Sequence, residues 1–444
     1  MCEKLPITSI EQFHLNDDST DLPNVICCDI EVSGAVDIEL ANAALQQVLG
    51  RHPLVYARQQ GKHWVLDPKL KEQCQFEVLN ELDTDQNGVC RKRVAQPNGA
   101  LFRPVMVCGQ QTTQLCFRVH HSICDGLGGL QFVIDWLSTY HRLHDGSKKP
   151  RSRKTNAAML AQRNHLRLLT RQFIGKLWLQ PIAIFGASKF MFRSVVPVGQ
   201  SSPLPQGDST EQTGGDFQVL QADLDEAEFA VLKQRSSQAN VNTNELILRA
   251  VFLAIHQVRK QMGLHRKNEW LRLIVPINIR DFADRRLPAA NRATLVQIDR
   301  NDRDFADPEK LIAGLNRELG VIKRCNLEKT FLLILRIFSA FPGAIARSAK
   351  RDICRATSVV TNLGAPFERV KLARVDGKLQ AGNLILEGVR LIVPLRPKTA
   401  VGFAVLRYAG RQVLCLHFDP RQIDQEMAQK IMDLVLQDLR REQN

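Results

Sequence analysis

The segment 120–128, with the sequence HHSICDGLG, lies where a strand pattern changes into a helix pattern. Apolar and polar residues alternate over 114–120, which predicts a strand with one apolar face. If the alternation continues, His121 shares that apolar face and His120 points to the other side. From Leu130 onward apolar residues recur at helical spacing, after a glycine-rich turn. The chain is therefore expected to turn sharply from strand to helix at two adjacent histidines.

His121 is the candidate general base on chemical grounds. Burial disfavours the charged form of an imidazole, so a histidine on an apolar face stays neutral near physiological pH. A neutral imidazole can accept a proton from an attacking hydroxyl or amine. The alternative is an ordinary core histidine, which a lone His121 would favour. The combination His-His-x-x-x-Asp-Gly is specific enough to favour the functional interpretation.

This segment resembles the HHxxxDG signature of an acyltransferase superfamily. The superfamily includes chloramphenicol acetyltransferase, nonribosomal-peptide condensation domains, polyketide-associated acyltransferases, wax ester synthases and plant BAHD enzymes. Weaker segments resemble further motifs of the superfamily in the same order along the chain. They are RHPL at 51–54, VPINIR at 275–280 with Asn291-Arg292 after it, TSVVTNLG at 357–364 and LCLHFD at 414–419.

The resemblance implies an α/β fold, an α+β sandwich of two chloramphenicol-acetyltransferase-like halves with a tunnel between them. The length of 444 residues agrees, because single hydrophobic cores usually stop growing below this size. We expect an N-terminal half at 1–146 that carries the motif, a basic crossover at 147–215 and a C-terminal half at 216–444.

Hydrophobic patterns predict the secondary structure of both halves. The expected strands are Val25–Val32, Leu54–Val65, Val105–Cys108, Gln114–His121, Leu271–Ile277 and Thr294–Ile298. The expected helices are Asp37–Leu49, one that starts at Leu130, Asp225–Arg235, Asn244–Gln261 and Gln425–Arg441.

The resemblance also implies a mechanism. An acyl thioester and an acceptor enter the tunnel from opposite faces and meet at His121. His121 removes the proton of the acceptor and returns it to the leaving sulfur, and no covalent acyl-enzyme forms. Gly126 lets a backbone N–H approach the oxyanion of the tetrahedral intermediate.

Other residues match positions that hold the motif or approach the substrate. Asp125 corresponds to an aspartate that pairs with an arginine of the second half, for which Arg280 is the candidate, and His120 is expected to help hold the motif. A helix N-cap is the alternative role for Asp125. Asn362 and Asn278 correspond to positions near the substrate. An ordinary turn for Asn362 and a strand edge for Asn278 are the alternatives.

The implied donor is acyl-CoA or the acyl-phosphopantetheine of a carrier protein, as a substrate rather than a bound cofactor. The expected acceptor is a hydrophobic small molecule or lipid with a hydroxyl or amine. The chain lacks a DFGWG motif, which counts against the plant subgroup. Two alternatives stay open: a free-standing condensation enzyme that forms an amide, and a catalytically silent binding or scaffold protein. An intact His121 disfavours the silent protein.

The positive charge is concentrated in one segment. The chain has a formal net charge of +14, and no acidic residue lies between Gly146 and Gly207. Over 148–193 basic residues alternate with apolar ones, and Met159–Phe173 has the pattern of a basic amphipathic helix. Three interpretations stay open: a solvated face, contact with an anionic membrane surface, and binding of an acidic carrier protein or coenzyme A phosphates. Nucleic acid is disfavoured, because no nucleic-acid-binding motif accompanies the segment.

Compartment and metal content are predicted from cysteines, histidines and apolar runs. The 11 cysteines include no C-x-x-C pair, which favours reduced thiols, and Cys124 inside the motif is expected to be structural. No apolar run approaches the roughly 18 residues of a membrane span, and no secretory leader is evident. A cytoplasmic protein is expected, with the inner face of the membrane as a contact. No metal site is expected, since His141 and His144 lack partners at ligand spacing.

Overall fold

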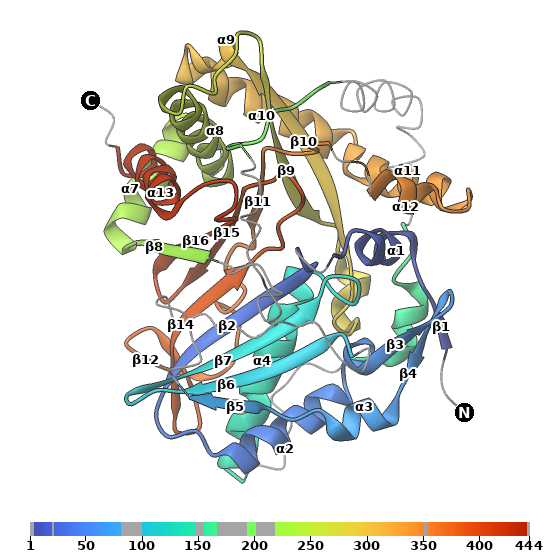
Figure 1. Cartoon of the computed structure of the whole chain (residues 1–444). Helices are drawn as coiled ribbons and strands as arrows, with labels where there is room; N and C mark the ends of the chain where they lie inside the picture. The colour runs from blue at the N-terminus through green and yellow to red at the C-terminus, as the bar shows by residue number, and fades with distance from the viewer. Residues whose placement is uncertain are drawn as a thin grey trace, which may run out of the picture.

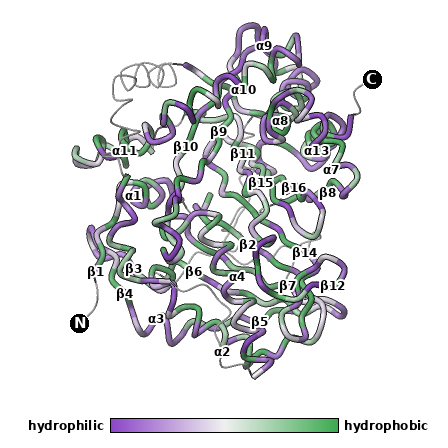
Figure 2. Tube along the Cα trace, turned by 180° about the vertical axis from the view of Figure 1, so that it is seen from behind, coloured by the Kyte–Doolittle hydropathy of each residue, from purple (hydrophilic) through white to green (hydrophobic). Residues whose placement is uncertain are grey.

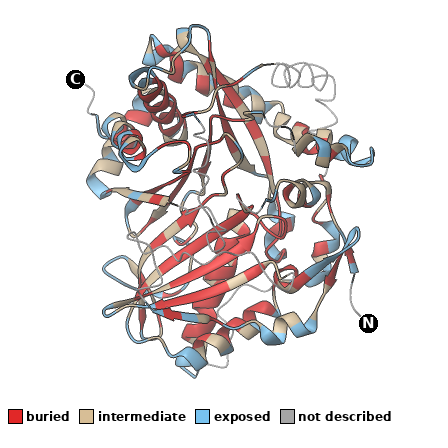
Figure 3. Cartoon of the chain, in the orientation of Figure 1, coloured by how far each residue is buried: buried red, intermediate tan, exposed pale blue. Residues whose placement is uncertain are grey.

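The computed structural model describes residues 4–19, 22–80, 100–146, 155–166, 193–200, 218–349, 351 and 353–441. These residues form two lobes, each built on one large sheet with helices packed against it (Figure 1). Buried residues concentrate in the two sheets and in the helix faces that cover them (Figure 3). From behind, hydrophobic and polar residues alternate along many of the strands, and polar residues are frequent on the outer loops (Figure 2). The expected α/β fold with two halves is confirmed.

The N-terminal lobe has a seven-stranded sheet in the order β12-β13-β14-β2-β7-β6-β5. Its strands are β2 (Val25–Ser33), β5 (Glu77–Asn80), β6 (Phe102–Cys108), β7 (Thr112–His120), β12 (Ala373–Val375), β13 (Lys378–Ala381) and β14 (Leu384–Ile392). Helices α2 (Ile38–Leu49) and α4 (Gly126–His144) pack together and share one hydrophobic core with the sheet. α4 is therefore held rigidly against β2 and β7, directly after the histidine motif.

The C-terminal lobe has a six-stranded sheet in the order β10-β9-β11-β15-β16-β8. Its strands are β8 (Gln218–Leu224), β9 (Trp270–Asn278), β10 (Ala293–Asn301), β11 (Ser358–Asn362), β15 (Val401–Tyr408) and β16 (Arg411–Phe418). Its helices are α7 (Glu226–Gln238), α8 (Thr243–Gln261), α9 (Asp302–Phe305), α10 (Pro308–Arg324) and α13 (Gln425–Arg440). Aspartate N-caps begin α7 and α13, at Asp225 and Asp424, as the predicted helix starts require.

Smaller elements complete the N-terminal region and the face between the lobes. A three-stranded sheet contains β1 (Lys4–Pro6), β4 (His63–Leu66) and β3 (Ala57–Gln60). The remaining α-helices are α1 (Ser9–Asn16), α3 (Pro68–Gln73), α11 (Thr330–Ser339) and α12 (Ala344–Ala349), and 3-10 turns cover Pro53–Tyr56, Ala157–Gln162, Phe282–Arg286 and Leu327–Lys329. α1 packs against α11 and α12, which joins the two lobes at one side. Among the described residues, no helix is long and apolar enough to cross a bilayer.

One predicted strand is wrong. The segment Leu54–Val65 begins with a 3-10 turn and continues as the β3–β4 hairpin rather than as a single strand. Pro53 starts the turn, because its fixed φ suits the first helical position. Gly61 adopts a φ of +59° at the hairpin, a conformation that glycine tolerates without strain.

Residues 373–392 cross from the second half of the chain into the first sheet. β14 pairs antiparallel with β2, with Val389 opposite Ile30, so β12, β13 and β14 extend the N-terminal sheet. The predicted domain boundaries, at 1–146, 147–215 and 216–444, stay a prediction. They do not include this crossing of residues 373–392 into the first sheet. The two lobes are consequently tied together by a shared sheet as well as by the contacts of α1.

The predicted basic amphipathic helix Met159–Phe173 is wrong where the structure describes it. Residues 157–162 form a 3-10 turn, and Arg163 is buried against Glu11, with Nε 2.7 Å from Oε1. Arg163 also donates to the carbonyl of Pro6, so its charge is satisfied inside the protein. Residues 167–173 of the predicted helix lie outside the described residues, as do 147–154 and 174–192 of the predicted basic crossover.

Candidate active site

The histidine motif forms the expected strand–turn–helix. β7 ends at His120, and α4 begins at Gly126. Asp125 is the N-cap of α4, and its Oδ1 accepts a hydrogen bond from Gly128 N at 2.9 Å. His121 lies one residue beyond the strand, where its backbone N–H donates to the carbonyl of Asn24 at 2.8 Å. The motif therefore lies at the junction of β7 and α4, as the sequence predicts.

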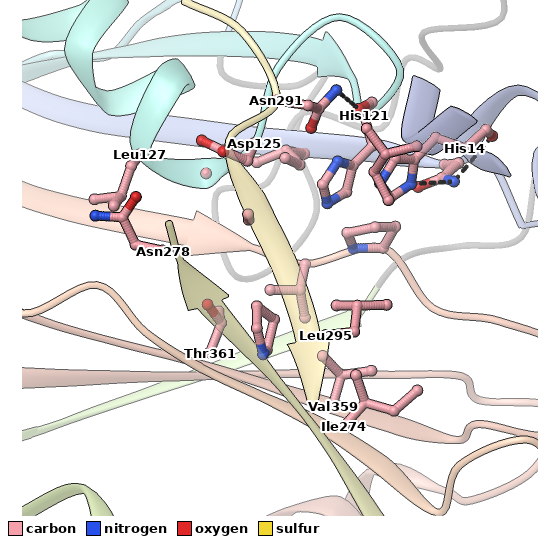
Figure 4. Close-up of a pocket in the computed structure, with 18 of the residues that line it drawn as sticks. His14, His121, Asp125, Leu127, Ile274, Asn278, Asn291, Leu295, Val359 and Thr361 are labelled. Atoms are coloured by element: carbon pink, nitrogen blue, oxygen red, sulfur yellow. Dashed lines mark hydrogen bonds between the residues drawn. The ribbon is translucent and has the colours of Figure 1, made fainter. Parts of the chain in front are cut away.

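A pocket of about 1050 Å³, counted out to open solvent at its mouth, lies between the lobes. Figure 4 shows His121 and Asp125 at one wall and residues of the second sheet, such as Leu295 and Val359, at the opposite wall. Six of the predicted site residues line this pocket: His121, Asp125, Gly126, Asn278, Arg280 and Asn362. His120 is not among the lining residues. The structure thus brings together nearly all of the residues singled out from the sequence.

The His121 imidazole is placed to act as a base. Its Nδ1 is buried and has no hydrogen-bond partner in the part of the chain that the structure describes. Burial lowers the pKa of His121 below its ordinary value of 6.5, although its hydrogen bonds and the charge of Asp125 oppose the shift. The ring is therefore neutral at physiological pH, and a neutral imidazole has one nitrogen lone pair that can accept a proton.

His14 of α1 packs directly on His121. The two rings stack with centroids 3.8 Å apart and an angle of 9° between their planes (Figure 4). Asn24 holds His14 through its Nδ2, 3.3 Å from His14 Nδ1 and 3.1 Å from His14 O. Burial, and then the proximity of His121, keep the pKa of His14 well below its ordinary value. Two protonated rings at this distance would repel each other, so the stack favours a neutral His121.

His120 has a structural role in the turn. Its Nδ1 is 2.7 Å from Ser122 Oγ and accepts a hydrogen bond from Ser122 N at 3.1 Å. Its Nε2 lies 3.5 Å from Asp18 Oδ2, outside the pocket. These contacts agree with the predicted role of holding the motif.

Asp125 and Arg280 form the expected ion pair across the two lobes. Arg280 donates to both carboxylate oxygens of Asp125, at 2.8 and 2.9 Å, and Arg292 N donates to Oδ2 at 2.7 Å. Burial alone would raise the pKa of Asp125, but Arg280 and the N–H donors of Arg292 and Gly128 lower it below its ordinary value. Asp125 is both an N-cap and half of an interlobe ion pair, so the two proposed roles coexist.

The loop 289–292 of the second lobe forms hydrogen bonds to the backbone of the histidine motif. Asn291 donates through Nδ2 to the carbonyls of His121 at 2.8 Å and Ser122 at 3.0 Å. Ala289 N donates at 2.8 Å to Nδ1 of His52, the histidine of the RHPL segment. His52 is fully buried, and its Nε2 lies 2.9 Å from Asp135 Oδ2 of α4. This loop therefore fixes both the backbone that carries His121 and the helix behind it.

The two candidate asparagines have local partners. Asn278 Oδ1 accepts from Arg280 N at 3.0 Å and from Arg280 Nη1 at 3.3 Å, so it positions the arginine. Asn362 Oδ1 accepts from Gly364 N at 2.9 Å, which is the turn role that the sequence left open. Both side chains also line the pocket. Cys124 is buried with a pKa raised by burial, which agrees with a structural thiol.

We expect Gly128→Ala to destabilise the protein by about 1–3 kcal/mol, because overpacking a tight core costs this much. A Cβ at Gly128 would lie 2.9 Å from Cys124 Cβ and 3.2 Å from Ala290 O. Gly126→Ala is the matched control, since its Cβ would have no contact closer than 3.4 Å, to Leu363. Urea unfolding of both variants measures the difference. Equal stability of the two variants would contradict the close approach of loop and helix.

The sequence missed three residues of this site: His14, Asn24 and Asn291. His14 comes from a short helix far from the motif, and nothing in its local pattern points to a stacked pair. Asn291 lies in a segment with a recognisable motif, but its role depends on a contact between lobes. Among the described residues, the one cluster suited to a metal lies outside this pocket.

No protein-family model matches the chain, and no curated protein sequence does. Solved structures do match. Polyketide synthase associated protein 5 from Mycobacterium tuberculosis aligns with a TM-score of 0.61 and 14% identity, over 98% of this chain and 97% of that one.

Condensation domains match over a similar extent. The first condensation domain of the calcium-dependent antibiotic synthetase, in complex with a substrate analogue, aligns with a TM-score of 0.65 and 12% identity, over 99% of this chain and 96% of that one. The starter condensation domain of rhizomide synthetase, in complex with C8-CoA and Leu-SNAC, aligns with a TM-score of 0.65 and 12% identity. The alignment covers 98% of this chain and 94% of that one. At this identity the likeness concerns the fold: the chain has the condensation-domain fold of two chloramphenicol-acetyltransferase-like halves.

Proposed function

We propose that this protein is an acyltransferase that moves an acyl group from a thioester to a hydroxyl or amine, with His121 as the general base. The observation that carries the proposal is the neutral His121 imidazole in a pocket between the lobes, with no hydrogen-bond partner for its Nδ1 among the described residues. His121 takes the proton of the acceptor as it attacks the thioester carbonyl, and then gives that proton to the departing sulfur.

The N-terminus of α4 supplies a second element of the proposed chemistry. The first N–H groups of a helix have no acceptor within the helix, and they carry partial positive charge. Gly126 and Leu127 line the pocket at this helix start. Backbone N–H groups at these positions would stabilise the oxyanion of the tetrahedral intermediate. Asp125 and Arg280 are positioning residues, because their ion pair holds the start of α4 against the second lobe.

Acyl-CoA or acyl-phosphopantetheine is the proposed donor, as a substrate. A condensation domain of the same fold is known in complex with C8-CoA, which supports a thioester of this kind. The second-lobe wall of the pocket is largely apolar, with Ile274, Leu295 and Val359, and this supports a hydrophobic acceptor. Contact of the segment 148–193 with an anionic membrane stays a prediction, since most of this segment lies outside the described residues.

The experiment that tests this function follows thiol release by the purified protein. Acyl-CoAs of graded chain length and an acyl carrier protein are the donors, and a panel of alcohols and amines are the acceptors. Acceptor-dependent thiol release supports the proposal if the product is an ester or is an amide made from acyl-CoA. An amide product made only from carrier-bound substrates would favour the free-standing condensation enzyme. If every donor is inert, the silent binding protein becomes the better account.

The pH profile of the reaction should report His121. Because burial lowers the pKa of His121 below 6.5, the base form persists into mildly acidic solution. We therefore expect kcat/KM to stay level through neutral pH and to fall only as the pH drops below about 6.5, the ordinary histidine value. A plot of kcat/KM against pH measures this. An acidic limb centred at or above pH 7 would contradict a desolvated His121 as the base.

A further inference from the structure

Three potential metal ligands converge at the far end of the second lobe. They are His256 of α8, His265 in the turn between α8 and β9, and Asp302 at the start of α9. One ligand atom from each lies within 4.8 Å of those from the other two. None of the three lines the pocket of His121, and α9 stands at the opposite end of the lobe from the histidine motif in Figure 1.

His265 has the arrangement of a metal-ligating histidine. Its Nδ1 is 3.2 Å from Glu269 Oε1, so the Nδ1–H donates to that carboxylate. Its Nε2 faces Asp302 Oδ2 at 3.6 Å. Histidines that bind metals typically donate their other ring N–H to a carboxylate, which sets the tautomer and the orientation of the ring. The Nε2 lone pair of a neutral His265 therefore points at a second carboxylate, and a cation between the two atoms would remove their repulsion.

Two buried polar atoms of the cluster have no hydrogen-bond partner among the described residues. His256 is only 9% exposed, and its Nδ1 is one of these two atoms. Asp302 Oδ1 is likewise buried and without a hydrogen bond, while Oδ2 accepts from Asn268 N at 2.9 Å. Buried polar atoms of this kind are rare, and a bound ion is one established reason for them. A protonated His265 between two carboxylates would satisfy Asp302 and Glu269 but not His256.

Two imidazoles and one carboxylate are a donor set that suits zinc. Zinc binds histidine nitrogen and carboxylate oxygen at about 2.0–2.2 Å in tetrahedral geometry, which places ligand atoms about 3.4 Å apart. The 3.6 Å between His265 Nε2 and Asp302 Oδ2 is close to such an edge. The His256 ring must move toward this edge, and no hydrogen bond at its Nδ1 restrains it.

The surrounding charges permit a divalent ion. Asp302 contributes one negative charge directly. Glu269 lies behind His265 but is paired with Arg259, with Oε2 2.8 Å from Nη2, so it offers less attraction.

We propose that His256, His265 and Asp302 bind one Zn²⁺ ion, with a fourth position open to water. Bound there, the ion links the end of α8, the turn that follows it and the start of α9. It would act as a structural clip on the second lobe, away from the acyl-transfer pocket. This site was not predicted from the sequence, since its ligands come from three elements and lack the short spacings of common zinc motifs.

Titration of the full-length, chelator-treated protein tests the site. Zn²⁺ binding is followed by calorimetry and Co²⁺ binding by visible absorption. We expect one ion per chain, a Co²⁺ spectrum without a thiolate charge-transfer band, and a rise in the unfolding temperature on adding Zn²⁺. His265→Gln and Asp302→Asn should each weaken binding at least about 100-fold, more than a change in the outer shell of a metal site usually does.

His63→Gln is the matched control, because His63 is exposed on β4 and has no place in the cluster. It should bind Zn²⁺ as tightly as the wild type. The unfolding temperature of each variant in chelator shows whether the fold is intact, and the nearly isosteric Asp302→Asn keeps the test valid if a histidine variant is unstable. Absence of stoichiometric binding to the wild type, or binding that survives both substitutions, would overturn the proposal. The outcome is independent of acyl transfer.

Discussion

His121→Ala is expected to lower kcat/KM for acyl transfer by about 10²–10⁴-fold, the usual contribution of a positioned general base. The substitution removes the imidazole but leaves Asn24 and Asn291 bonded to the backbone at this residue. The measurement is thiol release from the best donor and acceptor, at several pH values. Loss of the acidic limb in the variant would show that this limb belongs to His121.

His63→Ala serves as the control for this prediction, since it removes an exposed imidazole on β4. His14 stacks on His121, so the alanine variant needs a check of fold by circular dichroism and unfolding temperature. A folded His121→Ala protein that transfers acyl groups within about threefold of the wild-type rate would exclude the general-base role, because such a change is far below the usual range.

Asp125→Asn should destabilise the protein by about 3 kcal/mol, since removing one partner of a buried ion pair leaves the other charge uncompensated. This figure is at the lower end of the usual range because the Arg280 side chain is 17% exposed, against 5% for Asp125. Asparagine keeps the helix N-cap, so the loss reports the ion pair together with the bond from Arg292 N to Oδ2. Urea unfolding at pH 7 measures it.

Asp67→Asn is the matched control for this second prediction. Asp67 also caps a helix, α3, and also pairs with an arginine, Arg58, at 3.0 Å, but the Arg58 side chain is 50% exposed. An exposed pair contributes at most about 1 kcal/mol. Similar losses for the two variants would contradict a special role of the Asp125–Arg280 pair.

The same ion pair should also affect how the free energy of unfolding depends on pH. Because the pKa of Asp125 is lowered in the folded state, its contribution is present above the unfolded value near 3.8 and is lost as the pH falls through the folded value. The wild type and Asp125→Asn should therefore converge in stability only in acid, below about pH 4.

The sequence predicted those parts of the site that depend on local order. The turn from β7 into α4, the N-cap at Asp125 and its arginine partner Arg280 all follow from short motifs, and the structure places them as expected. His121 follows the end of β7 and lines the pocket. The predicted catalytic roles themselves stay predictions.

Contacts between segments distant in the chain could not be predicted from the sequence. The pairing of β14 with β2 joins residues more than half of the chain apart, and no local pattern specifies such a partner. The stack of His14 on His121 and the bond from Asn291 to the motif backbone have the same origin. Arg163 shows the opposite case: its basic surroundings indicated an exposed helix, but Glu11 from a distant helix buries it.

The central claim is direct transfer of an acyl group to the acceptor by a neutral His121, and intact-protein mass spectrometry during acyl transfer tests it most directly. The purified protein is mixed with acyl-CoA, with and without acceptor, and both the product and the protein mass are followed. We predict acylated acceptor, thiol release that requires the acceptor, and no added acyl mass on the protein. A stable acyl adduct on the protein that is chemically competent to form product, or transfer at an unchanged rate in His121→Ala, would contradict the account.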